Sequence, residues 1–213
     1  MRSVLDFSFA RDGRLWKLIY GLLTAGLFGY AIARRFALPL TPILDADSPN
    51  FLWPALLKLN GEGFVHTAGL NFLYPAFLFV LLRVFSDFRV IVVVQHLLGL
   101  TGGVFFLLGW NRLHDLDVGA CLRRSVHQVI GLVGAAIYLL SPTPMLFEMQ
   151  IRAEALCMFA QLLGLWLLFE FVYHRRERAD THAFFYGLGA IGSAFLLSSL
   201  KPSFTLAALF TIG

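Results

Sequence analysis

Residues 90–111 read VIVVVQHLLGLTGGVFFLLGWN, a stretch of 22 residues without a charged side chain. About 20 helical residues cross the hydrocarbon core of a bilayer, so this stretch is long enough to span one. Four further uncharged apolar stretches occur in the chain, at residues 18–33, 125–147, 155–169 and 181–200. We therefore expect an all-α fold, a polytopic transmembrane bundle with about five complete spans.

The composition supports the same fold class. Of the 213 residues, 58% are hydrophobic and only 14% are charged, whereas a soluble domain carries roughly 25% charged residues. So few charges cannot cover a globule of this size, which makes the lipid bilayer the expected partner. The composition excludes a disordered chain, a disulfide scaffold, a coiled coil and a nucleic-acid-binding domain. The net charge of +4 does not indicate nucleic-acid binding, because in a membrane protein the Lys and Arg residues report orientation. Cys121 and Cys157 are expected to be unpaired.

The distribution of Lys and Arg predicts the orientation. Ten of the seventeen basic residues lie in residues 1–17, 111–125 and 174–182. These segments share one side if the apolar stretch 70–85 does not cross the membrane. If it does cross, about eight basic residues fall inside and nine outside. Because basic loops favour the cytoplasm, we expect the first arrangement, with a cytoplasmic N-terminus.

In this topology, residues 34–89 form a long external loop with two helices along the membrane surface, at Ser48–Leu59 and 71–85. We interpret the first span as an uncleaved anchor, the alternative being a secretory signal. A last apolar run begins at Pro202 and reaches Gly213, too short to cross. It predicts the start of a sixth span, with residues 1–213 forming a single transmembrane domain, the N-terminal part of a longer protein.

Two carboxylates, Asp45 and Asp47, stand one residue apart at the expected start of the helix Ser48–Leu59. Such a pair could bind a divalent cation or supply a general base. Alternatively, Asp47 or Ser48 could simply cap the helix, with Pro49 at its first position.

Two further polar features fall on the same predicted external side. Glu154 opens the fourth span, where a carboxylate needs a partner or a wet cavity, or only interacts with the helix dipole. Lys201 follows the fifth span and could contact a lipid phosphate, or only snorkel to the interface. Together with the two aspartates, these residues indicate a site at the outer membrane surface.

Other polar residues are weaker candidates. His66 lies in the external loop and could contact a phosphate, although an ordinary loop histidine is the simpler interpretation. Gln95 and His96 lie within the second span and must form hydrogen bonds inside the bundle. The sequence contains no P-loop, Cys/His metal cluster or Gly-x-Ser-x-Gly motif.

The order of these motifs resembles that of the GT-C superfamily of integral membrane glycosyltransferases. The motifs are the acidic Asp45-Ala-Asp47-Ser48, then Leu73-Tyr74-Pro75, then Gln95-His96, then Ala153-Glu154, and finally Leu200-Lys201-Pro202. The chain is most similar in character to bacterial relatives of the protein mannosyltransferases and of the lipid A aminoarabinose transferase. Phe51 stands where families of this kind often have Tyr.

The resemblance implies transfer of a sugar from a polyprenyl-phosphate donor to a glycan, lipid or protein acceptor, at the outer face of the cell inner (plasma) membrane. It implies that Asp47 is the general base, with Asp45 as its partner. Lys201 would contact the donor phosphate and Glu154 would line the cavity. His66 and Tyr74 are further candidates for binding substrate, and Asp45, Asp47 and Glu154 could hold a divalent cation such as Mg²⁺ or Mn²⁺.

Two other functions remain open. A transporter or flippase of a lipid-linked substrate would need carboxylates inside the bundle, and a structural membrane subunit would use the acidic residues only as helix caps. The positions of Asp45, Asp47, Glu154 and Lys201 discriminate, because an enzyme requires them to meet at the outer surface.

Overall fold

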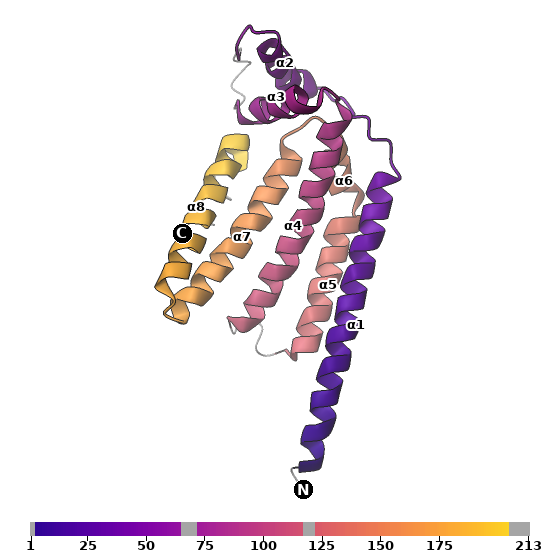
Figure 1. Cartoon of the computed structure of the whole chain (residues 1–213), viewed down its shortest axis with the longest axis vertical. Coiled ribbons are helices and arrows are strands. Elements are labelled where there is room, and N and C mark those ends of the chain that lie inside the picture. The colour runs from indigo at the N-terminus through magenta and orange to yellow at the C-terminus, as the bar shows by residue number, and fades with distance from the viewer. Residues whose placement is uncertain (1–2, 65–71, 117–121, 205–213) are drawn as a thin grey trace.

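The computed structural model describes residues 3–64, 72–116 and 122–204. Five long helices lie side by side, and two shorter ones lie across one end of them (Figure 1). The elements are α1 (Ser3–Phe36), α2 (Ser48–Leu59), α3 (Leu73–Phe85), α4 (Arg89–Asp115), α5 (Arg124–Leu140), α6 (Pro142–Met149), α7 (Glu154–Arg176), α8 (Asp180–Leu200) and the short 3-10 helix η1 (Pro202–Phe204). The described ranges contain no strand, only an isolated β-bridge between Ile43 and Gln150. The predicted all-α class is confirmed.

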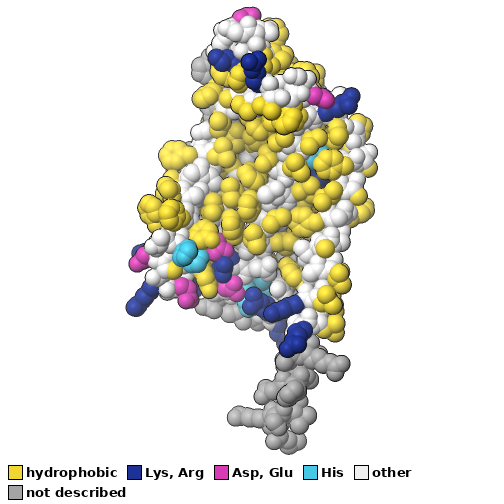
Figure 2. All heavy atoms as spheres, in the orientation of Figure 1, with side chains coloured by type: hydrophobic (Ala, Val, Ile, Leu, Met, Phe, Trp, Pro, Cys, Tyr) yellow, Lys and Arg dark blue, Asp and Glu magenta, His cyan; other side chains and the backbone are white. Residues whose placement is uncertain are grey.

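Within the described residues, four helices are long and apolar enough to cross a membrane: α1 from Gly13 onward, α4, α7 and α8. The pair α5 and α6 would make a fifth span if its two parts cross together. Hydrophobic side chains cover a broad band around the middle of the bundle, with Lys, Arg, Asp and Glu gathered towards its ends (Figure 2). This distribution fits a multi-pass membrane protein.

The stretch 125–147, expected as one span, forms two helices. The axes of α5 and α6 differ by 43°, and Ser141 between them has an extended backbone with ψ of 139°. Pro142 is the cause, because its ring disfavours helical backbone at the preceding residue and it has no N–H to donate. After the break, α6 and the segment that follows it continue towards the α2–α3 end of the bundle (Figure 1).

Helices α2 and α3 pack on one another and cover the ends of the long helices α4 and α8. Phe51 of α2 and Tyr74 of α3 meet edge to face, with their ring centroids 5.1 Å apart. Beneath them, buried side chains from the long helices and from the segment before α7 complete a hydrophobic core, including Ile91, Ile151, Leu156 and Leu197. The α2–α3 pair is therefore fixed over the bundle by apolar contacts.

Helix α4 lies at the centre of the bundle and packs on α7, α5 and α6. Small residues let helices approach closely in apolar surroundings, and Gly99 is the clearest example. A Cβ atom at Gly99 would overlap the carboxylate of Glu148 on α6. The glycine thus leaves room for a buried acidic side chain.

Candidate functional site

A cluster of five charged side chains lies at the end of the bundle covered by α2 and α3. The Arg152 guanidinium is at its centre: Nη1 lies 2.9 Å from Oδ2 of Asp45, and Nη2 lies 3.3 Å from Oδ2 of Asp47 and 2.9 Å from Oε1 of Glu154. Lys201 Nζ lies 2.7 Å from the same Glu154 oxygen. These residues, the Arg152 cluster, include four of the candidates that the sequence indicated.

Four chain segments bring the cluster together. Asp45 and Asp47 precede α2, Arg152 lies in the short link between α6 and α7, Glu154 is the first residue of α7, and Lys201 follows the last residue of α8. The Ile43–Gln150 bridge aligns the first two segments: the Ile43 N–H donates to Met149 O at 2.8 Å, and the Ile151 N–H donates to Ile43 O at 3.4 Å. The helix ends and the bridge therefore set the geometry.

Asp45 has a structural role in addition to its ion pair. Its Oδ1 accepts hydrogen bonds from the N–H and the hydroxyl of Ser48, at 2.9 and 2.8 Å, and from the Asp47 N–H at 3.1 Å. Asp47 stands directly before α2 but makes no side-chain capping bond. Side-chain capping by Asp47 is therefore wrong, and the N–H of Ser48 is bound by Asp45 instead. Partial burial alone would raise the pKa of this carboxyl, but the hydrogen bonds from Ser48 and the charge of Arg152 lower it below its ordinary value.

Asp47 is the accessible carboxylate of the cluster. Its side chain is 55% exposed, against 19% for Asp45 and 12% for Glu154. Its contact with Arg152, at 3.3 Å, is also the longest of the three. Of the three acids, Asp47 is therefore best placed to accept a proton from an incoming hydroxyl group.

Tyr74, predicted to bind substrate, lies beside the cluster but is completely buried. Its hydroxyl donates to Oε1 of Gln95 at 2.7 Å. Nε2 of Gln95 donates in turn to the carbonyl oxygens of Glu148 and Gln150, both at 2.8 Å. In this conformation Tyr74 supports the link that carries Arg152 and exposes no surface to a substrate, so a direct contact stays a prediction. His66 lies outside the described residues.

A second charged group lies deeper in the bundle. Arg35 on α1 forms two bonds to Glu148 on α6, from Nε to Oε2 at 2.7 Å and from Nη2 to Oε1 at 2.8 Å. His96 on α4 lies with Nδ1 2.8 Å from Oε2 of Glu148. All three side chains are fully buried. The expectation that Gln95 and His96 form hydrogen bonds inside the bundle is confirmed.

Three of the residues that organise this end were not among the predicted site residues: Arg152, Arg35 and Glu148. A signal for Glu148 was present, since an acid within the apolar segment Pro142–Met149 requires a buried partner. Nothing in the sequence indicated which base would be that partner, because Arg35 lies 113 positions away.

The predicted divalent-cation site does not fit the arrangement seen here. Within the described part of the chain, no three His, Cys, Asp or Glu side chains are arranged to hold a metal ion. The carboxylates of Asp45, Asp47 and Glu154 instead share the Arg152 guanidinium. Binding of Mg²⁺ or Mn²⁺ stays a prediction.

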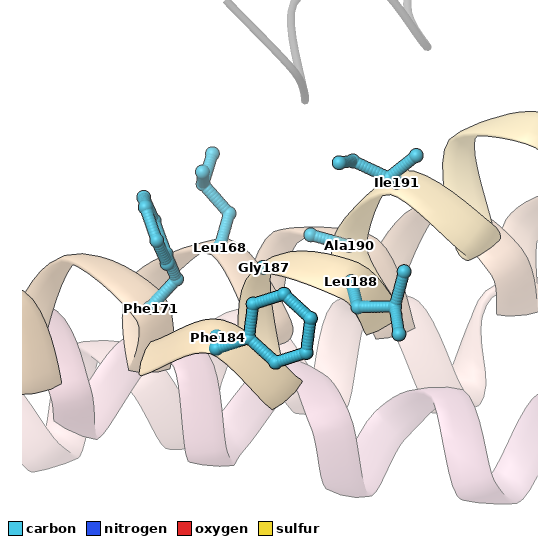
Figure 3. A pocket seen from close by; sticks show the side chains of 7 residues that line it. All are labelled: Leu168, Phe171, Phe184, Gly187, Leu188, Ala190 and Ile191. Atoms are coloured by element: carbon cyan, nitrogen blue, oxygen red, sulfur yellow. The ribbon is translucent and has the colours of Figure 1, made fainter. Parts of the chain in front are cut away.

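A hollow of about 290 Å³ lies on the opposite half of α7 and α8. Apolar side chains of the two helices surround it (Figure 3). Its lining residues are Leu168, Phe171, Phe184, Gly187, Leu188, Ala190 and Ile191. With no charged or hydrogen-bonding side chain among them, the hollow offers no group for proton transfer or phosphate binding, and the candidate site is the Arg152 cluster.

Comparison with family models, curated proteins and solved structures gives no match for this chain.

Proposed function

We propose that this chain carries the reaction centre of a GT-C-like membrane glycosyltransferase, which moves a sugar from a polyprenyl-phosphate donor to an acceptor hydroxyl group. The observation that carries the proposal is the meeting of Asp45, Asp47, Glu154 and Lys201 around Arg152. These are the residues that the motif resemblance assigns to such a site.

The cluster has the groups that this transfer needs. The acceptor oxygen attacks the anomeric carbon, the bond from that carbon to the phosphate oxygen breaks, and the phosphate leaves with the electron pair. Asp47 takes the proton of the acceptor hydroxyl. Lys201 and Arg152 offset the negative charge that develops on the phosphate. Attack opposite the leaving group inverts the configuration at the sugar carbon.

Two buried polar atoms beside the cluster lack hydrogen-bond partners among the described residues. They are Nε of Arg152 and Oε1 of Gln150. Buried polar groups are nearly always hydrogen-bonded in folded proteins. Both atoms are inaccessible in this conformation, so a phosphate oxygen or a sugar hydroxyl group would reach them only after the link of residues 150–153 moves.

The proposed topology places the cluster outside the cytoplasm. The N-terminus, the end of α4, the start of α5 and the turn between α7 and α8 lie at the end of the bundle opposite to α2 and α3 (Figure 1). That end holds the three segments with ten Lys and Arg residues, which favour the cytoplasmic side. We therefore propose an inner-membrane protein with an external segment 34–89, five spans including α5–α6, and a sixth starting after Pro202.

The test is sugar transfer by the full-length protein in native membranes, which supply the acceptor. Polyprenyl phosphates labelled in mannose or in aminoarabinose serve as donors in separate assays. We expect Asp47→Asn to slow transfer by about 100-fold or more, as for loss of a general base. Asp180→Asn is the matched control, because Asp180 is an exposed carboxylate paired with Arg175 at the other end. Wild-type transfer rates in Asp47→Asn would overturn the assignment, as would inactivity of the wild type with both donors.

A transporter or flippase of a lipid-linked substrate is the second candidate. It is favoured by Glu148, which is fully buried in the bundle with Arg35 and His96, since intramembrane charges often line transport pathways. Movement of a fluorescent polyprenyl phosphate across proteoliposomes, without any transfer of sugar, would support this function instead.

A further inference from the structure

Two segments that are distant in sequence lie together at the α2–α3 end of the bundle and carry three residues of the Arg152 cluster. Residues 37–47 follow α1 and end with Asp45 and Asp47, and residues 150–153 follow α6 and carry Arg152. Three sets of contacts join them. Arg35 pairs with Glu148 at the base, Ile43 bridges to Gln150 in the middle, and Asp45 pairs with Arg152 at the tip.

The base of this arrangement is the most constrained. Arg35 and Glu148 form a two-bond ion pair, which fixes both the distance and the plane of the guanidinium. Nη1 of Arg35 also donates to Leu139 O on α5 at 2.8 Å, and His96 on α4 holds Oε2 of Glu148. Four helices therefore meet at one carboxylate and one guanidinium.

Arg35 is the buried polar attachment of helix α1, which is also held by hydrogen bonds from Trp16 to Gln128 and from Arg34 to Leu140 O, both at 2.7 Å. Only 6% of its apolar stretch is buried, and besides the Arg35–Glu148 pair with α6 it packs mainly on α5 and α4. Arg35, close to its end, is in contrast fully buried. Arg35 therefore fixes the end of α1 from which residues 37–47 start.

A buried ion pair is a costly way to hold helices together. Well-packed apolar residues of similar volume are often equally stabilising or better, whereas a two-bond pair allows only one alignment of its partners. The Arg35–Glu148 pair lies at the base of the two segments that the Ile43–Gln150 bridge joins. Because the bridge needs one alignment of these segments, an ion pair that allows only one alignment suits this position.

We infer that Arg35, Glu148 and His96 form a buried lock that sets the register of residues 37–47 against residues 149–152, and so positions Asp47 relative to Arg152. The effect on register stands by itself, and the effect on sugar transfer rests on the proposed function. In that reaction the three residues are positioning residues, four or more residues away from the cluster along the chain.

The chain contains a matched control at the opposite end of the bundle. Glu170 on α7 is also buried and lies between an arginine and a histidine, 2.9 Å from Nη2 of Arg112 and 3.7 Å from Nε2 of His174. Glu148→Gln and Glu170→Gln thus remove the same charge from similar surroundings. Of the two glutamates, only Glu148 lies at the base of the two segments.

The test is amide hydrogen exchange, followed by mass spectrometry, on the full-length protein in nanodiscs. We expect Glu148→Gln to speed exchange in peptides spanning residues 39–47 and 148–153 by about tenfold or more, because a buried pair loses one partner. The N–H groups of Ile43 and Ile151 donate the hydrogen bonds of the bridge, so their exchange rates measure its opening directly. Peptides of α7 and α8 are expected to keep wild-type exchange, as is the whole segment 37–47 in Glu170→Gln.

Arg35→Lys gives a second measurement if Glu148→Gln does not accumulate in membranes. Lysine keeps the charge but cannot form the two-bond pair, so we expect a smaller increase in the same two peptides. Unchanged exchange there in both variants would overturn the lock, and so would an equal increase in Glu170→Gln. If exchange changes as expected but the wild-type protein transfers no sugar, the proposed function fails and the lock stands.

Discussion

Nη1 of Arg152 lies 2.9 Å from Oδ2 of Asp45, 107 positions earlier in the chain. This ion pair joins the segment before α2 to the segment before α7, and it places Arg152 where Asp47 and Glu154 can share the same guanidinium. The carboxylates of the candidate site are thereby held together by a cation that lies between them.

Replacing Arg152 is expected to disrupt the cluster. Arg152→Met leaves Asp45 and Asp47 without their cation, and we expect the free energy of unfolding to fall by roughly 1–3 kcal/mol, the range for unsatisfied groups that are partly buried. Arg152→Lys is expected to lose less, since lysine keeps the charge but cannot contact three carboxylates. Thermal unfolding in nanodiscs measures both.

Arg124→Met is the control for this prediction. Arg124 is 65% exposed and lies 3.8 Å from Asp115, so it should change stability very little, as exposed ion pairs do. An Arg152→Met protein as stable as Arg124→Met would contradict a central role for Arg152.

Lys201→Met is expected to weaken phosphate binding. A charge-assisted hydrogen bond contributes about 1.5–3 kcal/mol, so the Kd of farnesyl phosphate, measured by calorimetry, should rise about tenfold or more. Lys58→Met is the control, because Lys58 lies on α2 over the ring of Phe64, outside the cluster. Equal affinities of the two variants would show that Lys201 does not bind the phosphate.

The ion pair of Asp45 predicts a specific pH dependence of stability. Its pKa is lowered in the folded protein relative to the ordinary value of 3.8, so the unfolded chain takes up a proton first as the pH falls. The stabilisation from Asp45 is therefore fully present above the unfolded pKa, and it is lost as the pH falls through the folded pKa.

We accordingly expect the difference in melting temperature between the wild type and Asp45→Asn to be constant from about pH 6 to 8 and to shrink below about pH 4. Scanning calorimetry in nanodiscs over this range provides the measurement. A difference that grows on acidification would contradict the assigned ion pair.

Gly99→Ala is expected to destabilise the bundle. The added Cβ would overlap the carboxylate of Glu148, and overpacking of this kind costs about 1–3 kcal/mol. Gly192→Ala on α8 is the matched control, because nothing lies within 4 Å of the new Cβ there. Helix propensity alone should stabilise the control by up to about 1 kcal/mol. Equal melting temperatures of the two variants would show that Glu148 moves away without cost.

Much of the secondary structure was predictable because it depends on local pattern. The uncharged stretches at 90–111 and 181–200 lie within α4 and α8, and the expected helix Ser48–Leu59 is α2. The break within the stretch 125–147 was not predicted, although its cause, Pro142, is visible in the sequence. Apolar content reports the environment of a segment, whereas a break depends on how a single residue fits the backbone.

The candidate site was partly predictable for a similar reason. Asp45, Asp47, Glu154 and Lys201 each stand at the end of an apolar stretch, where polar groups leave the lipid. Their shared side of the bundle follows from counting crossings. Arg152 was not singled out, because an arginine between two acids has no local pattern that reveals its partners.

The sequence by itself determined that this protein is helical, that its helices suit a membrane, and which polar residues lie near helix ends. These properties follow from hydrophobicity and helix propensity, which act over a few turns of chain. Only the tertiary structure decided that Arg35 pairs with Glu148, that Ile43 bridges to Gln150, and that Arg152 lies among three carboxylates. Such contacts depend on how distant helices pack, and a buried charge takes whichever opposite charge that packing brings within reach.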